Sequence, residues 1–126
     1  MNISHDQLKT QKPFSMPHDV KKYLRDIELA IEKIHSFLPE NYDFESFQND
    51  DKTQYAIERA LAIVGEAVYQ LMKIDKDVAI TDAALIAKTR HIIVHAYDTV
   101  DPIVVWDILK NHLGLLETEV RELLSK

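Results

Sequence analysis

The apolar side chains between Val20 and Leu38 recur at the three- and four-residue spacing of an amphipathic helix. The positions that carry the pattern are Val20, Tyr23, Leu24, Ile27, Ala30, Ile31, Ile34, Phe37 and Leu38. Pro39 ends it, because proline lacks the N–H that would continue a helix. Residues 1–17 show no sustained period, so we expect a tail or arm there and a helical domain over residues 18–126.

A second, longer helix is expected from Asp51, whose side chain can cap the helix while Gln54 reaches back to it. Its main apolar positions are Tyr55, Ala56, Ile57, Ala60, Leu61, Val64, Ala67, Val68, Leu71 and Met72. Ala62, Ile63 and Gly65 add a second apolar side, which predicts a central helix that is buried on two faces. Glycine inside a helix costs about 0.5–1 kcal/mol relative to alanine, so a close backbone approach at Gly65 would explain its presence.

The remaining chain predicts a short aromatic segment and a third helix. Residues 40–50 contain three aromatic side chains and are expected to form a turn of helix that closes one end of the core. The third helix has Thr81 or Asp82 as its N-cap and covers Ala83 to about Ala96.

Asp101 and Pro102 predict the start of a fourth helix, because aspartate is a strong N-cap and proline suits the first helical position. We expect this helix to continue to about Leu124 and to bury Trp106 in the core. Short connections force neighbouring helices to run mostly antiparallel. The expected fold is therefore an all-α, up-down antiparallel four-helix bundle with an N-terminal arm.

The amino-acid composition and charge exclude several classes of protein. The 126 residues are 46% hydrophobic with only two glycines and four prolines, which suits one helical domain. The chain has no cysteine, so disulfides, thiolate zinc sites and cysteine nucleophiles are excluded. Neither a signal peptide nor a long apolar run is seen, and we expect a cytoplasmic protein without a membrane partner. A net charge of −6 argues against a general duplex-binding surface but allows a small, locally positive site.

The candidate chemistry lies near the end of the third predicted helix, where Arg90, His95 and Tyr97 follow the spacing R-x-x-x-x-H-x-Y. An arginine can bind a phosphate through two parallel hydrogen bonds, and a histidine can transfer a proton near neutral pH. In RNA cleavage such a pair could deprotonate a 2′-hydroxyl and stabilise the phosphate without a metal. The alternative is that Arg90 is a surface residue and His95 a cap that interacts with the helix dipole.

Helical geometry bears on this choice. Arg90 and His95 lie about 140° apart around one helix at 100° per residue, so they do not share a face. They can converge only if the helix ends near His95 or if a second subunit contributes. A symmetric dimer that brings both copies of the segment to one cleft would meet this requirement.

Three neighbouring positions allow more than one interpretation. His91 and His95 are four residues apart, a metal-ligand spacing, but no third ligand follows, so we expect no metal site and treat His91 as a helper of Arg90 or as a solvent-exposed residue. Glu66 is either paired with a base such as Arg90 or placed at a wet edge of its helix. Tyr97 is either a packing residue or, if exposed, a modification target.

The strings RHIIVHAYDTVDPIVVWDIL and ERALAIVGEAV together resemble the HepT-like branch of the HEPN (higher eukaryote and prokaryote nucleotide-binding) superfamily. The similarity runs from about residue 19 to the C-terminus. The histidine at position 91 departs from the family, which often has asparagine there.

The resemblance implies a homodimer with the motif at a shared cleft and a metal-independent endoribonuclease toxin of a type VII-like toxin–antitoxin pair. Arg90 and His95 would be its active pair, with RNA as substrate and no cofactor. The antitoxin would be a minimal nucleotidyltransferase that transfers AMP to Tyr97. A non-catalytic nucleotide-binding module that partners a nucleotidyltransferase is the alternative function, and a purely structural bundle is a third.

Overall fold

The computed structural model describes residues 17–96 and 100–126, and all regular structure within these ranges is helical. The helices are α2 (His18–Phe37), α3 (Phe44–Gln48), α4 (Asp51–Ile74), α5 (Ala83–Val94), α6 (Pro102–Asn111) and α7 (Leu113–Leu124). The predicted all-α class is confirmed. Residues 1–16, most of the predicted arm, lie outside the described ranges. No helix within those ranges is long and apolar enough to cross a membrane.

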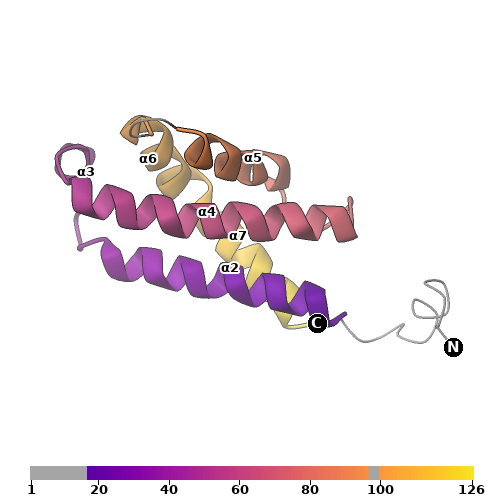
Figure 1. The fold of residues 1–126 in the computed structure, drawn as a ribbon. Helices are drawn as coiled ribbons and strands as arrows, with labels where there is room; N and C mark the ends of the chain where they lie inside the picture. Colours follow the sequence, from indigo (N-terminus) through magenta and orange to yellow (C-terminus); the bar gives the residue numbers. More distant parts are fainter. Residues whose placement is uncertain (1–16, 97–99) are drawn as a thin grey trace, which may run out of the picture.

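Helix α4 occupies the centre of the molecule (Figure 1). It runs antiparallel to α2 on one side and packs along α5 on another, while α7 lies against α2. The prediction of a central helix that is buried on two faces is therefore confirmed. Its buried residues are Gln54, Ile57, Glu58, Ala60, Leu61, Val64, Gly65, Ala67, Val68 and Leu71.

The N-terminus of α4 differs from the sequence-based expectation. Asp50, and not Asp51, is the N-cap, and its carboxylate accepts a hydrogen bond from the backbone N–H of Thr53. The Tyr42 hydroxyl donates to the same carboxylate at 2.5 Å, and the Thr53 hydroxyl donates at 2.7 Å. These hydrogen bonds, led by the one from Tyr42, lower the pKa of Asp50. Gln54 does not reach back as in a capping box, but donates to the carbonyl of Phe47 at 2.7 Å.

Aromatic side chains close this end of the core, as the sequence predicted. Phe47 on the short helix α3 is fully buried, and its ring centroid lies 5.3 Å from that of Trp106. Tyr42 and Phe44 also meet Trp106 edge to face. Trp106 is half-buried on α6 and belongs to this aromatic cluster, in agreement with its expected packing role.

The prediction of one continuous helix from Pro102 to about Leu124 is wrong, because the chain breaks at His112 into α6 and α7. The start is as predicted, since the Asp101 carboxylate accepts from the N–H of Ile103 at 2.9 Å. At the break, His112 Nδ1 lies 2.9 Å from Asp82 Oδ2, at the start of α5. Asp82 is therefore engaged with a distant histidine, and its side chain forms no capping hydrogen bond with α5.

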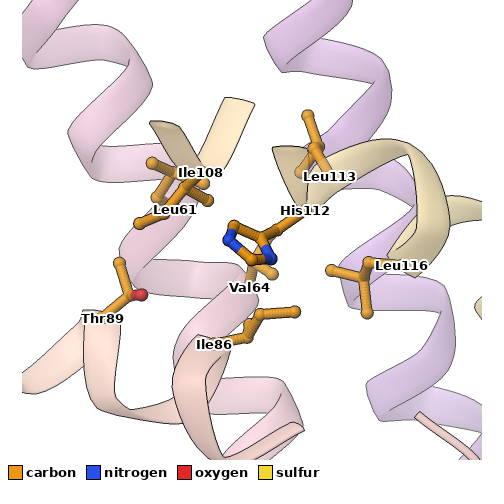
Figure 2. Close-up of a pocket in the computed structure, with 8 residues that line it drawn as sticks. All are labelled: Leu61, Val64, Ile86, Thr89, Ile108, His112, Leu113 and Leu116. Atoms are coloured by element: carbon orange, nitrogen blue, oxygen red, sulfur yellow. The ribbon is translucent and has the colours of Figure 1, made fainter. Parts of the chain in front are cut away.

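Figure 2 shows the side chains of four helices that meet around the break at His112. The His112 ring lies among mostly apolar side chains from α4, α5, α6 and α7. These neighbours are Leu61, Val64, Ile86, Thr89, Ile108, Leu113 and Leu116. The space left between them is about 10 Å³, no more than one water molecule needs. The side chains around the break therefore fill the core beside α5, the helix that carries the candidate catalytic residues.

Candidate functional site

The candidate site begins with a close contact between α4 and α5 at Gly65. A Cβ placed on Gly65 would lie 2.8 Å from the Cβ of Arg90, 2.9 Å from its backbone nitrogen and 3.0 Å from the carbonyl oxygen of Ile86. Real Cβ atoms do not approach other atoms this closely, so only glycine permits this packing. The close backbone approach predicted at Gly65 is confirmed, and the helix segment it touches is the one that carries Arg90.

The side chain of Arg90 forms an ion pair with Glu66. Arg90 Nε lies 3.0 Å from Glu66 Oε2, and both atoms are buried although the two side chains are 34% and 47% exposed. The Nε–H does not point at this oxygen well enough to form a hydrogen bond, so the contact is a charge pair. Of the two alternatives for Glu66, pairing with Arg90 is the one that the structure shows. No hydrogen bond to another described residue occupies the terminal amino groups of Arg90.

Arg90 forms part of the wall of two open hollows. The first, of about 360 Å³, lies between α2, α4 and α5 and includes Lys22, Arg59, Glu66 and Val94 in its lining. The second, of about 390 Å³, lies between α4 and α5 on the side of Tyr69. The guanidinium carbon of Arg90 is 5.6 Å from the centre of the Tyr69 ring. A phosphate at Arg90 could therefore be approached from either hollow.

His95 lies at the end of α5, where it is the C-cap residue and is exposed. Its backbone N–H donates to the carbonyl of His91 at 3.1 Å, and the two imidazole rings are 4.3 Å apart. Because α5 ends at Val94, one of the two conditions for convergence with Arg90 is met. Within the described part of the chain, however, no ion pair or hydrogen bond joins Arg90 to His95.

The remaining site expectations have mixed outcomes. His91 is exposed, lies with its ring tilted against that of His95 and lines the second hollow together with Arg90. Tyr97 lies outside the described residues. The described residues contain no group of three or more histidine, aspartate or glutamate side chains placed to hold a metal ion.

The sequence analysis missed Tyr69 and Lys88, which line the second hollow. The spacing of Tyr69, three residues after Glu66 and four after Gly65 on one helix, was the available signal.

Comparison with known proteins identifies the family. A model of the family described as "Ribonuclease HepT-like" matches residues 27–123. "Probable ribonuclease HepT" of Thermococcus cleftensis is 35% identical over 112 residues, which cover 86% of this chain and 98% of that protein. "Putative RNase MJ1216" of Methanocaldococcus jannaschii is 30% identical over 111 residues, 85% of this chain and 88% of the relative. Among solved structures, none matches this chain.

The matched segment contains α3, α4, α5 and α6, the second half of α2 and all but the last residue of α7. It therefore includes Gly65, Glu66, Arg90 and His95. The chain belongs to the Ribonuclease HepT-like family. The resemblance inferred from its sequence motifs is thereby confirmed.

Proposed function

We propose that this protein is a metal-independent endoribonuclease that acts as the toxin of a type VII-like toxin–antitoxin pair. The observation that carries the proposal is the placement of Arg90. It is fixed by the glycine contact with α4, borders two open hollows and lies five residues before a histidine at an exposed helix end. The names of the similar proteins, as ribonucleases, support the same class of activity.

In the proposed reaction Arg90 binds the scissile phosphodiester and His95 accepts the proton of the adjacent 2′-hydroxyl. The 2′-oxygen attacks phosphorus, a bond forms between them, and the bond from phosphorus to the 5′-oxygen breaks. The products are a 2′,3′-cyclic phosphate and a 5′-hydroxyl end, and a protonated histidine supplies the proton to the leaving oxygen. His95, protonated by the 2′-hydroxyl, fits that acid role.

A homodimer is part of the proposal, because no hydrogen bond or ion pair joins Arg90 to His95 within the described part of one chain. Leu85 and Ile92, seven residues apart and so on one face of this helix, are 45% and 43% exposed, although such apolar side chains favour burial. Apolar side chains gathered on one exposed element are typical of the centre of a protein–protein interface. A second copy that covers part of α5 would bring its own Arg90 and His95 to the same cleft.

The central test is RNA cleavage without metal. The purified wild-type protein is expected to cleave a single-stranded RNA in excess EDTA and to leave products with 2′,3′-cyclic phosphate ends, identified by mass spectrometry. Intact RNA after long incubation, together with nucleotide binding and no growth arrest on expression, would instead support the alternative of a non-catalytic nucleotide-binding module. The net charge of −6 favours that alternative, because it weakens long-range attraction of RNA.

Regulation is proposed to occur at Tyr97, two residues beyond His95. A minimal nucleotidyltransferase antitoxin would join the phosphorus of AMP to the Tyr97 oxygen and release pyrophosphate from ATP. The added phosphate would bring negative charge two residues beyond His95 in the chain and compete with RNA.

Co-expression of a cognate minimal nucleotidyltransferase is expected to increase the mass of the wild-type protein by units of AMP. The Tyr97→Phe variant should keep its unmodified mass and its ribonuclease activity. Tyr69→Phe is the matched control and should still be modified. AMP on the Tyr97→Phe protein would show that Tyr97 is not the acceptor.

A further inference from the structure

The second hollow, between α4 and α5, combines positive charge with an exposed aromatic ring. Its volume is about 390 Å³, within the range of roughly 300–1,000 Å³ that small-molecule sites occupy. Its lining residues are Tyr69, Met72, Ala84, Ala87, Lys88, Arg90 and His91. None of these is acidic, although the whole chain carries a net charge of −6. The hollow is therefore a basic site on an acidic protein.

Tyr69 is the aromatic side chain of this hollow. It is 41% exposed on α4, so its ring is not a core residue. The Arg90 guanidinium carbon lies 5.6 Å from the ring centre and the Lys73 ammonium nitrogen lies 5.5 Å away. Both cations lie over the face of the ring, and Lys73 is the exposed one of the two, so a base can stack on Tyr69 by taking the place of the Lys73 side chain. Proteins bind single-stranded nucleic acids through such exposed rings, on which bases stack while nearby cations bind the backbone.

We propose that this hollow binds a nucleotide of single-stranded RNA next to the phosphodiester held by Arg90. Tyr69 stacks on the base, and Lys88 contacts a neighbouring phosphate. This inference rests on the proposed ribonuclease function, since Arg90 joins the hollow to the reaction.

The other walls of the hollow bear on base preference. Met72, Ala84 and Ala87 offer no side-chain hydrogen bond that would distinguish one base from another. Stacking without hydrogen-bond readout tolerates every base, because every base has a π face. The stacking contact therefore selects single strands over duplexes without preferring a base. A preference among bases would have to come from His91, which lines the hollow and can donate and accept hydrogen bonds.

The test measures binding of a fluorescent, single-stranded 2′-O-methyl RNA of mixed sequence, which lacks the hydroxyl needed for cleavage. Tyr69→Ala and Tyr69→Leu are expected to weaken binding by about 5- to 150-fold, the range for loss of one base stack. Tyr69→Phe keeps the ring and should bind as the wild type does. Tyr55→Ala is the control, because Tyr55 is 62% exposed on the same helix but does not line the hollow.

Lys88 is tested through the salt dependence of binding. Lys88→Gln should reduce the slope of log affinity against log salt by about 0.7, the value for one contact with a single-stranded phosphate. Lys52→Gln, at an exposed position on α4 away from the hollow, should leave the slope unchanged.

Several outcomes overturn the inference. Binding by Tyr69→Ala that matches Tyr55→Ala, or loss of binding in Tyr69→Phe, would show that the ring does not stack on a base. A change from dimer to monomer in Tyr69→Leu, measured by light scattering, would show that a second copy covers the hollow.

Cleavage assays separate this inference from the proposed function. If the wild type cleaves RNA and Tyr69→Leu has an unchanged KM, the inference fails and the ribonuclease proposal stands. If the wild type binds RNA through Tyr69 but never cleaves it, the nucleotide site stands and the ribonuclease proposal fails. The ribonuclease proposal and the nucleotide site are both supported only if Tyr69→Leu cleaves RNA with a raised KM and a kcat similar to that of the wild type.

Discussion

Replacing His95 by alanine is expected to lower the rate of RNA cleavage by about two to four orders of magnitude, the contribution of a positioned general base. Arg90→Ala should have an effect of similar size, because it removes the group that holds the phosphate and its developing charge. Initial rates on an end-labelled RNA in EDTA measure both effects. His35→Ala is the control, since His35 is an exposed histidine on α2 that pairs with Glu117. Equal rates for all four proteins would exclude this pair from the reaction.

A mixture of the two inactive variants tests whether the site is shared. If Arg90 of one copy works with His95 of the other, a dimer of one Arg90→Ala and one His95→Ala chain keeps one intact site and one doubly altered site. After exchange of subunits at equal amounts, about one quarter of the wild-type activity should return. A site built within one chain would give no recovery, since every chain in the mixture lacks one of the two groups.

Gly65→Ala is expected to lower both stability and activity. The new Cβ would meet the backbone nitrogen and Cβ of Arg90 at less than 3.0 Å, so α4 and α5 must move apart. Overpacking of this kind costs about 1–3 kcal/mol, which exceeds the gain of about 0.5–1 kcal/mol in helix propensity. A displacement near 1 Å at a catalytic group can reduce the rate by about 10²-fold, and Arg90 is the residue that is displaced.

Gly114→Ala is the matched control for this prediction. Gly114 is the other glycine of the chain, lies in α7, and has no atom within 4 Å of an added Cβ. Its replacement should raise stability by at most about 1 kcal/mol and leave cleavage unchanged. Urea denaturation and the EDTA cleavage assay measure both variants. A Gly65→Ala protein as stable and active as the wild type would show that the close contact is not required.

Local patterns predicted most of the fold. The helices α2 and α4 and the cap at Asp101 could be predicted, because each depends on residues that are close together in the chain. The close helix contact at Gly65 could be predicted because glycine inside a helix is unfavourable unless a neighbour leaves no room for a side chain. The break at His112 could not be predicted, because it involves Asp82, thirty residues earlier in the chain. The choice of Asp50 over Asp51 as a cap likewise depends on Tyr42, whose hydroxyl reaches it from another segment.

The site was predicted only in part, again because it depends on contacts between segments that are distant in the chain. The motif identified Arg90 and His95, but helical geometry alone could not say which group Arg90 meets, and Glu66 became its partner only when α4 and α5 were placed together. Tyr69 was missed because an aromatic residue on an amphipathic helix is normally assigned to the core. Its exposure and its position beside Arg90 are tertiary properties.

The pair between Glu66 and Arg90 also determines how anions compete for the site. The Glu66 carboxylate lies at Nε of the arginine as an internal anion and leaves the terminal amino groups for a phosphate. Its negative charge reduces the attraction that an incoming anion meets. A small monovalent anion is then held weakly, whereas a phosphodiester that also contacts neighbouring cations is still bound. The acidic partner of the arginine thus acts as a filter that discriminates against simple salts.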